Sequence, residues 1–203
     1  NSADFFSGAV ILERPDLMEK FTDLLPVSPV FQVGEAGDLR ISAETKTKIG
    51  NFLKVISLLP NEEKLNIGYE FEKIPRGISS LRVGNITFSR SFAKSMTNFS
   101  CHTGGLKHTL YPINSDFKQS TAPSSFVSSS GGFFATSGQV GFEFFDKRLF
   151  FNWNTSETAP LCLLDRENSY SRISFSLSEF DETSKPSNSY GSFELNISPV
   201  SLE

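Results

Sequence analysis

Residues that could do chemistry are few in this chain of 203 residues. Its two histidines, His102 and His108, lie with Cys101 in the short stretch CHTGGLKH. Imidazole nitrogens and a thiolate are ligands that zinc accepts. Their spacing matches no zinc-binding pattern, however, and the adjacent Cys101 and His102 would point to opposite sides of an extended chain. We therefore expect ordinary loop or core histidines, with no metal site and no cofactor.

Nucleophilic and acid–base catalysis find no stronger support. The sequence contains no G-x-S-x-G elbow, Walker loop or dinucleotide fingerprint. Catalytic pairs meet in space, so Cys101 beside His102 is not evidence for a thiol nucleophile. Carboxylates could serve glycosidic chemistry, but on loops and exposed faces they mostly solvate the surface. The carboxylates considered are Glu143, Asp165, Glu167, Glu179, Asp181 and Glu182. No catalytic residue is assigned.

The most distinctive stretch of the chain is aromatic. Residues 131–156 hold seven of the 21 phenylalanines and the only tryptophan. Two runs of alternating apolar side chains predict the two strands of a hairpin, each with one face toward the core. These side chains are Val140, Phe142 and Phe144 in the first run, and Leu149, Phe151 and Trp153 in the second. We place the turn at Asp146-Lys147, and we expect core packing because burial is the default use of Phe.

The opposite face of this hairpin would be only half polar, because it would carry Phe145 and Phe150. We predict that these two phenylalanines contact a partner. An alternative interpretation is a carbohydrate site, in which Trp153 and Asn152 contact a sugar together with Tyr170. The predicted register turns Trp153 inward, which makes the sugar site the minority interpretation.

Cys101 and Cys162 are the only cysteines. They could form one disulfide, but buried free thiols are more common for an isolated pair outside a small secreted domain. The sequence does not decide between these alternatives, and it leaves the cellular compartment open.

The first sixty residues mix helical and strand patterns. Leucine, methionine and phenylalanine recur at helical spacing over residues 15–25, which predicts a short amphipathic helix. A second helix is predicted from a cap at Ser42 to Pro60, with an apolar stripe of Ile49, Phe52, Leu53 and Ile56. Between the two helices, residues 28–44 predict two short strands around a turn that contains glycine.

From Glu63 onward the apolar period changes to two. The clearest strands are residues 65–71, 173–177 and 193–197, each with one apolar and one polar face. Leu81 and Val83 are out of phase with Ile86 and Phe88, so Gly84 and the next residue predict a bulge or turn. Residues 101–132 have little periodicity and predict a long irregular segment.

These patterns predict a mainly β protein. We expect an antiparallel β-sandwich, jelly-roll-like, or a partly closed barrel of roughly eight to ten strands. Two short N-terminal helices would cover the sheet. Residues 1–203 would form a single β-rich domain, in which residues 1–60 pack on the sheet and residues 63–203 form the sandwich.

Net charge and hydropathy exclude some functions. The net charge is −4 and no stretch is rich in lysine or arginine, which argues against nucleic-acid binding. No apolar run approaches the roughly 18–20 residues of a transmembrane segment. Three classes of function remain. The first is a structural or assembly subunit (capsid, tail or surface-layer type) that acts through a protein partner or self-association. The second is a carbohydrate-binding module, and the third is an enzyme with a site around His102 or His108.

Overall fold

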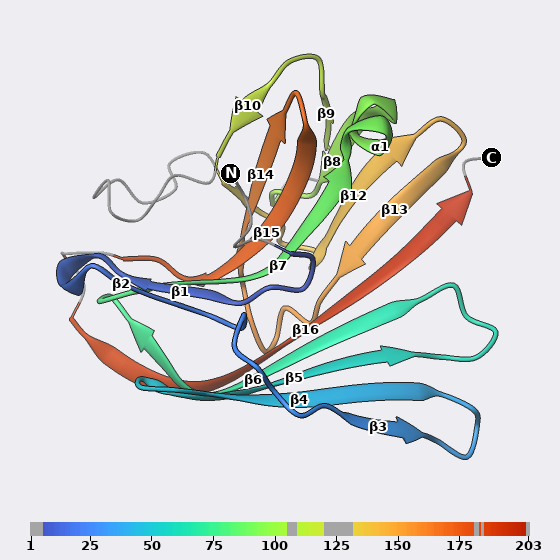
Figure 1. Cartoon of the computed structure of the whole chain (residues 1–203). Helices are drawn as coiled ribbons and strands as arrows, with labels where there is room; N and C mark the ends of the chain where they lie inside the picture. Colours follow the sequence, from blue (N-terminus) through green and yellow to red (C-terminus); the bar gives the residue numbers. More distant parts are fainter. Residues whose placement is uncertain (1–5, 105–108, 120–131, 181–182, 184, 202–203) are drawn as a thin grey trace.

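Two antiparallel sheets form the molecule in the computed structural model, which describes residues 6–104, 109–119, 132–180, 183 and 185–201 (Figure 1). The smaller sheet has the strand order β10-β14-β15-β7-β1-β2, with β11 also paired to β14. Its strands are β1 (Ile11–Arg14), β2 (Glu19–Thr22), β7 (Ser80–Ser89), β10 (Phe117–Lys118), β11 (Phe133–Phe134), β14 (Leu161–Glu167) and β15 (Tyr170–Ser178).

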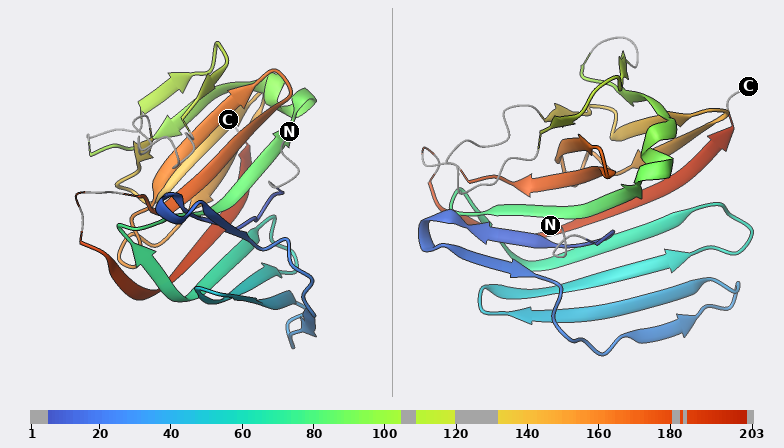
Figure 2. Two further views of the ribbon diagram at one scale, coloured as in Figure 1. Left: turned by 60° about the vertical axis from the view of Figure 1, so that its left-hand side comes forward. Right: turned by 45° about the horizontal axis from the view of Figure 1, so that its top comes forward.

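The larger sheet has nine strands in the order β3-β4-β5-β6-β16-β13-β12-β8-β9. They are β3 (Val30–Val33), β4 (Leu39–Thr47), β5 (Gly50–Leu58), β6 (Leu65–Arg76), β8 (Met96–Cys101), β9 (Thr109–Pro112), β12 (Gln139–Phe144), β13 (Lys147–Asn152) and β16 (Ser187–Ser201). The sheet is strongly curved, and the smaller sheet packs on its inner face (Figure 2).

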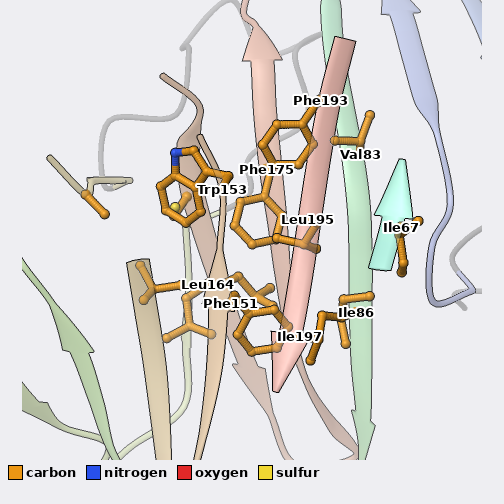
Figure 3. Close-up of a cluster of buried hydrophobic side chains, with 14 of the residues drawn as sticks. Ile67, Val83, Ile86, Phe151, Trp153, Leu164, Phe175, Phe193, Leu195 and Ile197 are labelled. Carbon is orange, nitrogen blue, oxygen red and sulfur yellow. The ribbon is translucent and has the colours of Figure 1, made fainter. Parts of the chain in front are cut away.

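The inner face of the larger sheet carries the core. Strand pairing aligns one apolar residue from each strand into a row across the sheet, because side chains of the same phase lie on one face. One such row consists of Leu58, Leu65, Ile197, Phe151, Val140 and Cys101. Opposite it, Phe175 of β15 lies between Trp153 and Phe193, with ring centroids 5.6 Å from each (Figure 3).

The predicted aromatic hairpin is confirmed as β12 and β13, with Phe142, Phe144, Phe151 and Trp153 all buried. The turn lies one residue earlier than expected, since Phe144 pairs with Lys147. Phe145 therefore occupies the turn, where it has a φ of 33° and is 84% exposed. That backbone region costs an ordinary L-residue about 1 kcal/mol or more.

Both predicted N-terminal helices are wrong. Residues 15–25 form only a 3-10 turn, Pro15–Leu17, before the chain continues as β2. The turn ends at Met18, whose φ of 52° is left-handed, and Phe21 then pairs with Leu12 of β1. The only α-helix among the described residues is α1 (Arg90–Ser95), which lies elsewhere in the chain.

The second predicted helix is instead the hairpin of β4 and β5. Phe52 and Ile56 are four residues apart, a spacing that places two side chains on one face of a helix and also on one face of a strand. In the sheet, Phe52 pairs with Thr45 and Phe71, and Ile56 with Ile41 and Ile67. Pairing with β6 therefore makes this segment a strand and not a helix.

The strands predicted by alternation are confirmed in β6, β15 and β16, and the two around the glycine turn are confirmed in β3 and β4. The predicted bulge in β7 is also present. Gly84 and Asn85 have φ values of 82° and 44°, and there the pairing with β15 shifts register. The described residues contain sixteen strands, more than expected, and residues 1–60 contribute β1 to β5 to the two sheets.

Cys101 and Cys162 are both buried free thiols, so the disulfide alternative is not realised. Burial raises the pKa of Cys101 to about 11. Burial, together with the neighbouring Cys101, raises the pKa of Cys162 well above its ordinary value. Both side chains are therefore protonated and packed as small apolar residues near neutral pH.

The hairpin yields a first prediction. Phe142→Ala removes a fully buried ring and should lower the free energy of unfolding by about 3–5 kcal/mol. Phe145→Gly, three residues later, removes an exposed ring from a left-handed position and should leave stability unchanged or raise it by up to about 1 kcal/mol. Urea denaturation of both variants is the measurement. A loss above about 1 kcal/mol for Phe145→Gly would contradict this turn geometry.

A second prediction concerns the thiols. A disulfide-exchange reagent such as DTNB, added at pH 7.5 without reductant, should leave the native protein unmodified, because only an exposed thiolate reacts quickly. After denaturation, both cysteines should react. Fast labelling of the native protein would contradict the burial, and no labelling of the denatured protein would reveal a disulfide.

Candidate functional site

Three chain crossovers between the two sheets lie at one end of the sandwich. They are residues 77–79 between β6 and β7, residues 153–160 between β13 and β14, and, between β15 and β16, the described residues 179, 180, 183, 185 and 186. Together with the adjoining strand ends they line a cleft of about 740 Å³, which we call the crossover cleft. This volume is within the range of small-molecule sites, and connections at the end of a sandwich are where such sites usually form.

The charged residues on the walls of the crossover cleft are Arg76, Glu157, Glu179 and Lys185. Hydroxyl groups come from Thr158, Ser178 and Ser187, and apolar contacts from Ala159, Leu177 and Phe180. Backbone bridging between Gly77 and Phe180 ties the first crossover to the third. The lining therefore combines hydrogen-bond donors, acceptors and one aromatic ring.

Glu179 is held in place by a nearly buried ion pair. Arg82 of β7 donates two hydrogen bonds to its carboxylate, Nε to Oε1 and Nη2 to Oε2, each 3.0 Å long. Ser176 of β15, the register partner of Arg82, also donates to Oε1. Bidentate pairing of this kind fixes both distance and orientation. The first residue of the third crossover is thus anchored to the smaller sheet.

Glu157 is positioned by the local structure of the second crossover. Asn154 Oδ1 accepts hydrogen bonds from the backbone N–H and hydroxyl of Ser156, and its Nδ2 donates to Glu157 Oε1 over 2.8 Å. Side-chain turns of this type are characteristic of asparagine. Thr158 Oγ1 then donates to the backbone carbonyl of Ser192 in β16, over 2.9 Å. The connection is ordered without belonging to a strand.

The residues of the sequence-predicted sugar site are not brought together by the fold. Trp153 is only 7% exposed, packs edge-on against Phe175, and has an indole N–H without a partner among the described residues. Tyr170 lies five residues from Phe175 along β15, a separation of roughly 16 Å. Asn152 accepts a hydrogen bond from Gln139 on the outer face of the larger sheet. Trp153 thus packs in the core.

Tyr170 has its own environment at the turn between β14 and β15. Burial and a hydrogen bond to Glu167 raise the pKa of its phenol, and the guanidinium of Arg172 lies 4.6 Å from its ring centroid. These contacts describe a local polar cluster away from the crossover cleft.

The predicted interaction pair, Phe145 and Phe150, does not form one surface. Phe150 is half-buried on the outer face of the larger sheet, where its ring covers Gly141 so closely that a Cβ there would lie 3.0 Å from it. Phe145 stands at the hairpin tip beside Phe92, where the two line a shallow apolar depression. Elsewhere on β12, burial raises the pKa of Glu143, but hydrogen bonds from Asn98 and Arg148 and the charge of Arg148 lower it by more, so its pKa lies below the ordinary value.

His102 forms a hydrogen bond through Nδ1 with Thr136 Oγ1, 2.9 Å away, and His108 lies outside the described residues. Across residues 6–104, 109–119, 132–180, 183 and 185–201, no group of three His, Cys, Asp or Glu residues is arranged to hold a metal ion. In the same part of the chain, no helix has the length and apolarity needed to cross a membrane.

Sequence reasoning missed most of the crossover cleft. Only Glu179 was among the carboxylates considered. Arg76, Glu157 and Lys185 are far apart in the sequence and share no motif, so only the pairing of β6 with β16 and the packing of the two sheets bring them together. Recognising three sheet-to-sheet crossovers would have required the strand order, which alternation alone does not supply.

Comparison with solved structures identifies the fold. α-N-acetylgalactosaminidase NagBb from Bifidobacterium bifidum, as a GalNAc complex, matches with a TM-score of 0.59 and 10% identity over 97% of this chain and 31% of that chain. Its Gal-NHAc-DNJ complex gives a TM-score of 0.58, with 95% and 30% covered. Slr1438 protein from Synechocystis sp. PCC 6803 gives 0.52 with 11% identity, over 88% and 67%.

These likenesses establish a shared two-sheet β fold. The chain spans about a third of the length of the NagBb structures that it matches. No protein-family description matches the sequence, and no curated protein sequence is similar to it.

The anchoring of Glu179 yields a third prediction. Glu179→Gln removes the carboxylate charge that pairs with the nearly buried Arg82 guanidinium, and should lower the free energy of unfolding by about 3 kcal/mol. The control is Glu19→Gln, which disrupts the more exposed pair with Arg14 and should cost less than about 1 kcal/mol. Urea denaturation of both variants measures the two losses in the free energy of unfolding. Equal losses would mean that the Arg82–Glu179 pair does not anchor the crossover.

Proposed function

We propose that this domain is a carbohydrate-binding β-sandwich module and that the crossover cleft is its ligand site. The observation that carries the proposal is the composition of the cleft walls. Charged and hydroxyl side chains from two crossovers and from the adjoining ends of β6, β15 and β16 converge there on a volume of about 740 Å³ that Phe180 also lines.

The chemistry of this lining suits a sugar. A pyranose presents hydroxyl groups around its rim, each able to donate and accept a hydrogen bond, and an apolar face of C–H groups. The carboxylate of Glu157 accepts from hydroxyl groups, and Arg76 and Lys185 donate to hydroxyl oxygens. Phe180 offers its ring to the apolar face. A few placed polar groups with one apolar wall is the usual form of a small-molecule site.

The comparisons support the same interpretation. NagBb was solved in complex with GalNAc and with Gal-NHAc-DNJ, so a protein that contains this fold binds an amino sugar. At 10% identity the ligand itself is not transferable, and the match covers about a third of that enzyme. We therefore propose sugar binding and assign no reaction to this chain.

The carbohydrate interpretation is now preferred over the assembly interpretation. Phe145 and Phe150, which were expected to share an assembly surface, lie in different environments. None of the matched structures described above points to a capsid, tail or surface-layer component.

The test is a fourth prediction. Isothermal titration against a panel of monosaccharides and oligosaccharides that includes GalNAc should find a ligand. Arg76→Ala and Glu157→Gln should each weaken its binding at least about tenfold, equivalent to about 1.4 kcal/mol. Lys147→Ala, an exposed lysine on β13, is the matched control and should bind like the wild type.

Circular dichroism must show that each variant keeps the native β spectrum. The proposal fails if no sugar in the panel binds at millimolar concentration. It also fails if a sugar binds with an affinity that neither cleft variant changes, since the ligand would then lie elsewhere on the sandwich.

A further inference from the structure

The apolar inner face of the larger sheet continues beyond the part that the smaller sheet covers. The row of Cys101, Val140, Phe151, Ile197 and Leu65 extends by register pairing into Leu58, Leu39 and Val33. Along it, Val140 and Phe151 are fully buried, whereas Leu58 is 47%, Leu39 51% and Val33 72% exposed. The same face that forms the core at one end is therefore bare at the other.

A second row repeats this pattern. Leu195 and Ile67 are buried, and the row continues through Ile56 to Ile41 and Phe31, which are 37% and 70% exposed. We call the exposed part of the two rows the open apolar face, which consists of Phe31, Val33, Leu39, Ile41 and Leu58. In the views of Figure 2, β3, β4 and β5 form the end of the larger sheet farthest from β14 and β15.

The edge strand of this face lacks charged side chains. β3 is an edge strand with the sequence VFQV, so it carries no charged residue and no proline. Edge strands normally carry such residues because they present unpaired backbone groups. A large apolar patch next to a bare edge is typical of an interaction site.

The rim of the open apolar face is acidic. The turn between β3 and β4 carries Glu35 and Asp38, and the turn between β5 and β6 carries Glu62 and Glu63, with Lys64 as the only cation in these two turns. Both turns lie directly beside the exposed ends of β3, β4 and β5. An occupant with an apolar stripe flanked by lysine or arginine would complement this charge distribution.

The connection from β2 to β3 is anchored where it begins. Asp23 at its start is buried, where it accepts hydrogen bonds from Lys54 Nζ of β5 and, over 3.1 Å, from the backbone N–H of Val10. The start of this connection is thus fixed against β5 before the chain continues to β3.

We propose that the open apolar face binds an amphipathic helix of a protein partner, with basic residues flanking the apolar stripe of that helix. Both rows run across β3, β4 and β5 for about 10 Å, roughly the distance between residues i and i+7 of a helix at about 1.5 Å per residue. A helix laid along the two rows would bury its i, i+3, i+4 and i+7 side chains. This surface is separate from the crossover cleft, and the proposal does not depend on sugar binding.

The fifth prediction uses model helices as probes. A fluorescent peptide of about 18 residues, with leucines on one face and lysines on the other, should bind the wild-type protein in fluorescence anisotropy. Phe31→Ser with Leu58→Ser should weaken binding at least about tenfold. Phe134→Ser with Leu110→Ser is the matched control, because these two side chains are 58% and 51% exposed but lie on β11 and β9, and it should bind like the wild type.

Charge and oligomeric state complete the test. The peptide with glutamate in place of lysine should bind at least about tenfold more weakly. In the double variant Glu62→Lys with Glu63→Lys, this difference in affinity between the two peptides should shrink or change sign. The proposal is overturned if the lysine peptide does not bind, or if both double-serine variants bind it equally. It is also overturned if light scattering shows a dimer that Phe31→Ser with Leu58→Ser abolishes, since a second copy would then occupy the face.

Discussion

The continuous apolar inner face of the nine-stranded sheet is the constraint on which the rest of the structure depends. Each strand contributes one side chain to each cross-strand row, so a register slip of one residue in any strand would turn its apolar set outward. The hydrophobic effect fixes the register, and the register fixes which turns and crossovers lie at each end. The buried pair of Phe151 and Phe175 shows the result, because it joins the two sheets at their centre.

Covering that face has a topological consequence. The chain must pass between the sheets several times, and three of these passages lie at one end of the sandwich. Crossovers cannot satisfy all their polar groups with strand pairing, so they use side chains: Asn154 orders the second crossover and the Arg82–Glu179 pair anchors the third. The polar crossover cleft is thus a product of the same packing that forms the apolar core.

The two proposed surfaces arise from opposite features of one sheet. Where the smaller sheet covers the larger one, the connections between them form the polar crossover cleft, which we propose as a sugar site. Beyond the smaller sheet, the part of the apolar face on β3, β4 and β5 stays exposed.

The sequence by itself determined the β class, the aromatic hairpin, the bulge in β7 and the strands within β6, β15 and β16, because alternation over five or more residues has no helical explanation. It could not separate helix from strand for Phe52 and Ile56, since a spacing of four fits both, and pairing with β6 decided that question. Only the tertiary structure brought Arg76, Glu157 and Lys185 to one cleft, buried Trp153 and separated it from Tyr170. The physical reason is that local periodicity reports which face of a strand is apolar, whereas strand order and coverage are set by contacts between residues far apart in the chain.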